Sequence, residues 1–467
     1  LHPRVRRQRQ MCIRDRSAPL YEHLLAYSKQ NRISFAMPGH KNGRGLKKDL
    51  LSLDVTELSA TENLIHPGEY VLKAQELLSS LYGSDKSYIL TGGSTSAIQS
   101  MICAGVKPGG TLLSAGDCHM SVINTCALLG INLKLFPKEI DNSFSVPKGT
   151  GTLKKHLTDD IDAVIITSPN YYGICSDIKN TAEECHAKNI PLLVDEAHGA
   201  HFIASNLFPQ TAVKYADAVC QSAHKTLNAM NGSSYLHING DLIDRKRLEK
   251  SLYMFQSSSP SYVIASSADI ARDELTDGAM WEKTYDMCKS FKEKITDTGI
   301  KVLKNDDMTR LVLNFSNLDI TGFDVDDILS NNGIDIEMAD LFNIVLIVTP
   351  SNTQSDMDVL FDELIKITNN TPKAKSTLNL TPPPICKEKL FPQKAFFSNQ
   401  RDTKLQNSIG HISCSTVVPY PPGVPVIYTG ETIRKEQIEY IEYLETKGAE
   451  ITGISNGTIA VSEQNNE

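Results

Sequence analysis

An aspartate and a lysine stand at the ends of two apolar runs in the middle of this sequence. Asp195 closes the run that begins at Pro191, and Lys225 closely follows the run ADAVCQ. Short apolar runs that end in polar residues are typical of buried parallel strands, whose carboxyl ends meet at one edge of a sheet. A carboxylate and an amine placed there suit pyridoxal phosphate, because its aldehyde bonds to a lysine and its ring nitrogen pairs with an acid. Either residue alone is more simply a helix cap or a surface charge.

The same stretch also fits a metal site. Asp195, His198 and His201 follow one another at intervals of three residues, which on a helix would place all three side chains on one face as ligands. A metal-dependent hydrolase would use such a site to activate water. This interpretation leaves Lys225 without a role, so it is the weaker alternative and we expect no metal here.

Strand-like segments recur along the first part of the chain. They centre near residues 89, 112, 165, 193 and 219, with helical patterns between them. This alternation predicts an α/β fold with a mostly parallel sheet and helices on both faces. After about residue 300 the pattern changes to short strands and helices that predict a smaller α+β domain.

Two other predicted strand exits carry polar side chains. Ser94 and Thr95 stand in a Gly-Gly-Ser-Thr turn that opens a helix, where free N–H groups and the helix dipole favour a phosphate. His119 follows the next strand, although a lone histidine in such a turn is more often a simple hydrogen-bonding residue. Ligands of open α/β sheets bind at strand exits, so we expect the site at this edge.

Several motifs together resemble the Orn/Lys/Arg decarboxylase family of fold-type-I pyridoxal-phosphate enzymes. They are MPGHK from Met37, DEAHGAH from Asp195, SAHK ending at Lys225, and YPPG followed by GE ending at Glu431. The resemblance extends from about Pro19 to about Glu431. It implies a pyridoxal-phosphate enzyme that decarboxylates a basic amino acid, which is arginine, lysine or ornithine.

The resemblance also implies roles for individual residues. Lys225 would hold the cofactor aldehyde, Asp195 would keep the ring nitrogen protonated, and His119 would cover the ring. The other residues expected to contact the cofactor are Ser94, Thr95, His198, Ser222, His224, Ser257 and Ser259.

The last two of these serines imply an assembly. In the family, the cluster that contains Ser257 and Ser259 reaches the phosphate of the neighbouring subunit, which implies a homodimer or a higher oligomer of dimers. The chain differs from the family pattern elsewhere, at Ala36, Met120, His411 and Thr429.

The reaction and the substrate stay open at this point. An aminotransferase could use the same fold and the same cofactor. The resemblance is to the short form of the family, without the receiver-like N-terminal domain of the larger acid-stress members, so we expect a type used in polyamine biosynthesis. Arginine and lysine are therefore the leading substrates.

Composition favours a soluble cytoplasmic enzyme. Apolar residues make up 40% of the chain and charged residues 22%, and the net charge of -8 argues against binding to nucleic acid or to anionic membranes. No apolar run approaches the roughly 20 residues of a membrane span. The ten cysteines include no CxxC pair, so reduced thiols are the simplest expectation.

At 467 residues the chain should form more than one domain. The expected parts are a disordered or artefactual Arg-rich segment 1–16, an N-terminal arm 17–50, a cofactor-binding large domain 51–300, a small α+β domain 301–368, a linker 369–384 and a C-terminal portion 385–467.

Overall fold

The computed structural model describes most of the chain. The described residues are 29–30, 32–57, 61–64, 66–374, 382–384, 389–420 and 424–463. The predicted segment 1–16 lies outside them, as do most of the arm before residue 29 and part of the linker 369–384.

The largest sheet of the described chain has eight strands. In spatial order they are β16 (Lys389–Leu390), β4 (Asn132–Phe136), β3 (Thr111–Ala115), β7 (Ala163–Thr167), β8 (Leu192–Asp195), β9 (Ala218–Gln221), β10 (Ser234–Ile238) and β2 (Lys86–Leu90). The run from β4 to β9 is parallel throughout. The strand β10 is antiparallel to both of its neighbours, and β16 is antiparallel to β4. The predicted mostly parallel sheet is therefore confirmed.

Helices cover both faces of this sheet, as the sequence predicts. One face carries α4 (Gly93–Gly105), α5 (Met120–Leu129) and α8 (Arg245–Phe255), and the other carries α3 (Glu69–Tyr82), α6 (Ile178–His186) and α9 (Tyr262–Glu274). Successive strand residues point to opposite faces, so Leu112 packs in one core and Leu113 in the other. Because helices cover both faces of the sheet, its strands are apolar at almost every position.

A second lobe follows the large sheet in the chain. Its antiparallel sheet has the order β11 (Lys301–Val302), β12 (Arg310–Asn314), β15 (Asn343–Ile347) and β14 (Met338–Ala339). The helices α10 (Gly278–Thr296), α11 (Gly322–Asn331) and α12 (Gln354–Asn370) accompany it. The short strand β1 (Ile33–Ser34) pairs with β13 (Ile334–Asp335), which ties the N-terminal segment to this lobe.

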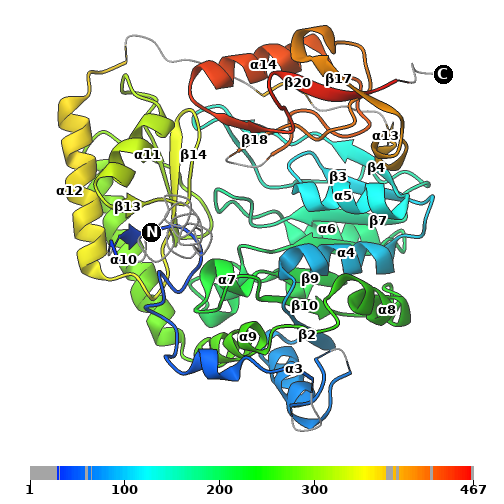
Figure 1. Cartoon of the computed structure of the whole chain (residues 1–467). Helices are drawn as coiled ribbons and strands as arrows, with labels where there is room; N and C mark the ends of the chain where they lie inside the picture. The colour runs from blue at the N-terminus through cyan, green and yellow to red at the C-terminus, as the bar shows by residue number, and fades with distance from the viewer. Residues whose placement is uncertain are drawn as a thin grey trace, which may run out of the picture.

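The C-terminal elements lie over the β3 and β4 side of the large sheet, coloured orange to red in Figure 1. They are α13 (Pro392–Phe396), β17 (Gln400–Lys404), β18 (Val418–Tyr420), α14 (Lys435–Thr446), β19 (Glu450–Thr452) and β20 (Thr458–Ser462). The hydroxyl of Tyr428 donates a 2.5 Å hydrogen bond to the carbonyl of Gly116 at the end of β3. This contact holds the C-terminal elements against strand exits of the large sheet.

Candidate active site

The chain brings Asp195 and Lys225 to neighbouring strand exits. Asp195 ends β8 and is paired with Cys220 of β9 in the parallel ladder, and Lys225 lies in the short helix α7 (Ala223–Thr226) directly after β9. The Asp195 side chain is buried, and its Oδ1 accepts a 3.1 Å hydrogen bond from the N–H of Ala197. Burial lowers the pKa of Lys225, and the charge of Asp195 opposes that shift. A lowered pKa favours the neutral amine that attacks an aldehyde.

His198 lies between Lys225 and a second basic residue. Its Nε2 is 3.1 Å from Nζ of Lys225, and its Nδ1 is 2.9 Å from Nη2 of Arg310. An arginine can only donate, so Nδ1 of His198 must accept. Burial, reinforced by the charge of Arg310, holds the pKa of His198 well below its usual range, so the ring is neutral. Its one proton is then on Nε2, and Nζ of Lys225 accepts it as an uncharged amine.

The N-terminal segment and the loop after β7 also contribute groups to the site. The hydroxyl of Tyr171 donates to Oε1 of Glu337 at 2.5 Å, and the N–H of Met37 donates to Oε2 at 2.7 Å. The Tyr171 ring also contacts the His198 ring edge to face, with 4.7 Å between centroids. Lys41 is buried nearby, and burial lowers its pKa to about 7.

The MPGHK motif packs directly on the loop that carries Lys225. The N–H of Gly39 donates to the carbonyl of His224 at 2.7 Å. A Cβ at Gly39 would lie only 2.4 Å from the carbonyl oxygen of Leu227. No larger residue fits there without a backbone shift, so this glycine allows the close approach.

The predicted phosphate residues surround the segment Gly232–Ser233. The N–H of Gly93, at the first turn of α4, donates to the carbonyl of Gly232 at 2.7 Å, and Nδ1 of His224 lies 2.8 Å from the carbonyl of Ser233. Ser94 and Thr95 are the next two residues of α4 after Gly93. The two predicted phosphate-binding stretches are therefore neighbours in space.

His119 and the serine cluster that contains Ser257 and Ser259 are more exposed than Asp195. His119 caps the start of α5, where its ring accepts from the N–H of Ser121, and its side chain is exposed. Ser257 and Ser259 are exposed in the loop between α8 and α9, next to Gln256, whose side chain accepts from the N–H of Thr91 at the turn before α4. Neither serine contacts Lys225 within the described part of one chain.

The alternative metal interpretation receives no support from the geometry. The chain leaves β8 through a turn, and His201 lies in a 3-10 helix, Ala200–Ala204, with its ring in the core. That ring stacks on Trp281 at 4.8 Å, and its Nε2 is 3.2 Å from Oδ1 of Asp307. Within the described ranges, no group of three or more His, Cys, Asp or Glu side chains is placed to hold a metal ion.

The residues of this site fit pyridoxal phosphate, because several of their buried polar atoms have no partner in the protein. Oγ of Ser222 is buried without a hydrogen-bond partner among the described residues, as are Nε and Nη1 of Arg310. Buried donors without partners are costly unless a ligand satisfies them. Donors of this kind suit an anionic ligand, and the neutral Lys225 amine beside them suits an aldehyde.

Sequence reasoning missed several residues of this cluster. Arg310, Tyr171 and Glu337 have no local motif that marks them, since they reach the site from separate loops and from the second lobe. Lys41 belongs to the MPGHK motif, which indicated the family resemblance but to which the sequence analysis assigned no role in the site.

Comparisons with known proteins match nearly the whole chain. The family described as "Orn/Lys/Arg decarboxylase, major domain" matches residues 18–312, and "Orn/Lys/Arg decarboxylase, C-terminal domain" matches 379–467. The chain is 33% identical over 466 residues to the uncharacterized protein YaaO of Bacillus subtilis, covering 94% of this chain and 96% of that protein. It is 29% identical over 471 residues to an arginine decarboxylase of the same organism, with the same coverage.

A solved structure has the same fold. The lysine decarboxylase LdcF of Francisella novicida superimposes with a TM-score of 0.76 at 20% identity, covering 95% of this chain and 80% of that one.

No described helix is long and apolar enough to cross a membrane.

Proposed function

The chain belongs to the Orn/Lys/Arg decarboxylase family of pyridoxal-phosphate-dependent carboxy-lyases, and we propose that arginine is the amino acid that it decarboxylates. The support for arginine is the group of relatives with that name that match 94% of this chain, or slightly more, at 28 to 29% identity. Lysine is the competing substrate, because matched relatives and the superimposed structure are lysine decarboxylases.

The observation that carries the proposed mechanism is the contact of Lys225 with His198. Pyridoxal phosphate supplies a sink for the electron pair left on the α-carbon when carbon dioxide departs. Nζ of Lys225, whose pKa is lowered by burial, would be the nucleophile that holds the cofactor through its aldehyde. The return of a proton to the α-carbon is assigned to Lys225 or to the neighbouring Nε2–H of His198.

The other residues assigned to the site would bind the cofactor and orient it. The carboxylate of Asp195 would hold a proton on the cofactor ring nitrogen, since a nearby negative charge favours the cationic form. His119 would cover the ring and, with Tyr171, would help to exclude water from the reacting carbon. Ser94, Thr95, Ser222 and His224 hold the phosphate, aided by the N–H groups at the start of α4. His198 would lie beside the ring.

We also propose a two-fold assembly with shared sites. Ser257 and Ser259 are exposed in one chain, where a role within that chain is not evident. In a dimer, these serines would complete the phosphate site of the partner. Closed two-fold symmetry is the commonest arrangement for soluble homo-oligomers.

One assay tests the substrate and the reaction together. The purified protein with pyridoxal phosphate is offered arginine, lysine and ornithine in turn, and carbon dioxide, amine and keto acid are measured. We expect carbon dioxide and agmatine from arginine at the highest kcat/KM. A higher kcat/KM on lysine would overturn the substrate, and keto acid without carbon dioxide would indicate an aminotransferase.

A further inference from the structure

Two chain segments meet between the large sheet and the second lobe, and two pairs of buried side chains join them. One segment follows β8 and carries His198 and His201. The other is the turn that opens β12, and it carries Asp307 and Arg310. Nδ1 of His198 lies 2.9 Å from Nη2 of Arg310, and Nε2 of His201 lies 3.2 Å from Oδ1 of Asp307. The partners are equally spaced along the two segments, so the two pairs are neighbours.

Asp307 shapes the turn that delivers Arg310. Its Oδ1 accepts from the N–H of Thr309 at 3.0 Å and from the Thr309 hydroxyl at 2.7 Å. Its carbonyl accepts from the N–H of Arg310 at 3.1 Å. These bonds fix the form of the turn itself. The contact with His201 differs from them, because it ties the Asp307 side chain to the segment that carries His198.

The His201 ring is packed so that its donor stays in one place. The side chains of His201 and Asp307 are fully buried. The ring stacks on Trp281 of α10 with 4.8 Å between centroids, and it meets the ring of Phe208 edge to face at 5.0 Å. A carboxylate accepts hydrogen bonds, so Nε2 of His201 is the donor. A hydrogen bond between buried groups is strengthened by the low dielectric around it, and its loss is correspondingly costly.

We propose that His201 is a positioning residue for Lys225. Through Asp307 it holds the turn that places Arg310 on His198. While the guanidinium occupies Nδ1 of His198, the proton of that ring stays on Nε2, which faces Nζ of Lys225 at 3.1 Å. Without the donor of His201 the turn is free to move away from His198, and the uncharged amine of Lys225 loses this support.

This inference rests on the proposed role of Lys225, but its test needs neither cofactor nor turnover. The measurement is the pKa of Lys225 in the cofactor-free protein, read from the pH dependence of trinitrobenzenesulfonate labelling of its peptide. A pKa that responds to His201 in a protein without decarboxylase activity would support the positioning role and refute the proposed reaction. The two proposals can therefore fail separately.

The variants are designed so that they leave no unpaired charge in the core. His201→Phe alone keeps the aromatic packing but strands the Asp307 carboxylate, which is strongly destabilising. The reference is therefore Asp307→Asn, whose amide oxygen still accepts from His201 and from Thr309. Adding His201→Phe to this reference removes the hydrogen bond alone. Relative to the reference, the double variant should raise the Lys225 pKa by about half a pH unit or more. Adding His201→Gln instead restores a donor of similar reach and should leave the pKa unchanged.

A further background shows whether the effect passes through the guanidinium. When Arg310→Met is already present with Asp307→Asn, adding His201→Phe should no longer move the Lys225 pKa, because the group that it positions is gone. His237→Phe is the matched control, since His237 of β10 is also a fully buried histidine, and its ring lies 4.5 Å from that of Tyr82. It should lower the melting temperature and leave the Lys225 pKa unchanged.

Thermal unfolding verifies that each variant is folded before its pKa is measured. An unchanged Lys225 pKa in the folded variant with His201→Phe and Asp307→Asn would overturn the proposal. So would an equal shift in the Arg310→Met background, or an equal shift caused by His237→Phe.

Discussion

Nη2 of Arg310 lies 2.9 Å from Nδ1 of His198, and this contact determines what His198 can offer to Lys225. Because the guanidinium occupies Nδ1 as a donor, the neutral ring carries its proton on Nε2, which is 3.1 Å from Nζ of Lys225. Two donors cannot face each other across that distance. The contact therefore favours the uncharged amine of Lys225, in agreement with the lowered pKa of this group.

Replacing Arg310 should change the pKa of Lys225 in the cofactor-free protein. Without the guanidinium, His198 can place its proton on Nδ1 and accept from an ammonium group, so Arg310→Met should raise the pKa of Lys225 by about one pH unit, or about 1.4 kcal/mol. The measurement is the pH dependence of trinitrobenzenesulfonate labelling of the Lys225 peptide, read by mass spectrometry.

Two controls separate the hydrogen bond from simple charge repulsion. Arg310→Lys keeps a cationic donor and should keep the Lys225 pKa near that of the unchanged protein. In a His198→Phe background the Arg310→Met change should have a smaller effect, because the ring that connects the two residues is gone. An equal effect in both backgrounds would mean that Arg310 acts on Lys225 through its charge alone.

Lys225 and Lys41 both lie near the proposed site. Comparing variants of the two lysines tests which of them binds the cofactor. Lys225→Ala should remove both the visible absorbance of the bound cofactor and the activity. Lys41→Met should retain the absorbance, because Nζ of Lys41 is engaged at 2.7 Å with the carbonyl of Ala36. Loss of absorbance in the Lys41 variant alone would reverse the assignment.

Asp195→Asn should separate cofactor binding from turnover. An amide fits the same space and can still accept from the N–H of Ala197, so the cofactor should remain bound. An amide carries no charge to hold a proton on the cofactor ring nitrogen, so kcat should fall by about a hundredfold or more. Absorbance measures binding, and release of carbon dioxide measures kcat. A kcat within a few fold of the unchanged enzyme would show that another group holds that proton.

A buried histidine should make the stability of the fold depend on pH. His237 of β10 is enclosed between Ser87 and Gln221, and burial lowers its pKa to about 3. The unfolded chain binds a proton at this residue near pH 6.5 and the folded chain does not, so stability is lost as the pH falls from about 6.5 towards 3. Urea unfolding of His237→Gln at fixed protein concentration should show a shallower loss between pH 7 and pH 5. An unchanged slope would exclude His237 as the cause.

The sequence was most informative where chemistry follows a strand along the chain. Asp195 and Lys225 could be paired in advance because parallel strands deliver their last residues to one edge. The weaker alternative, a metal site at Asp195, His198 and His201, assumed a helix, but the chain there turns instead of forming an α-helix, and the two histidines contact different residues.

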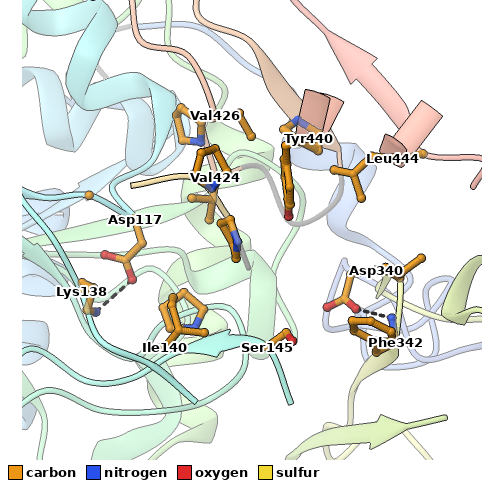
Figure 2. A pocket seen from close by; sticks show the side chains of 18 of the residues that line it. Asp117, Lys138, Ile140, Ser145, Asp340, Phe342, Val424, Val426, Tyr440 and Leu444 are labelled. Carbon is orange, nitrogen blue, oxygen red and sulfur yellow. Dashed lines mark hydrogen bonds and ion pairs between the residues drawn. The ribbon is translucent and has the colours of Figure 1, made fainter. Parts of the chain in front are cut away.

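Residues that arrive from the second lobe could not be found in this way. Arg310 opens β12 and Glu337 precedes β14, far along the chain from Lys225, and only the packing of the two lobes brings them to it. Asp340 of the second lobe and Tyr440 of the C-terminal helix α14, which line one cavity in Figure 2, could not be paired from the sequence for the same reason. Local spacing carries no information about contacts that are fixed by the docking of separate cores.

The proposed shared site makes a prediction that only mixed assemblies can test. Ser257→Ala with Ser259→Ala should weaken cofactor retention in a uniform dimer, although both serines are exposed in one chain and lie apart from Lys225. A ligand that binds only the assembled state stabilises that state, so removal of the cofactor should also weaken the dimer. Equilibrium dialysis measures cofactor retention, and sedimentation measures the dimer.

Mixing the serine double variant with the Lys225 variant decides whether the site is composite. Chains with both serines replaced are exchanged with Lys225→Ala chains, and subunit exchange is verified with differently tagged partners. If each site uses Lys225 of one chain and the serines of the other, a mixed dimer has one site with both defects and one with neither. Up to half of the normal activity should then return in each mixed dimer at limiting cofactor. If exchange occurs and activity stays at the level of the separate variants, each site is built within a single chain or these serines do not contribute to it.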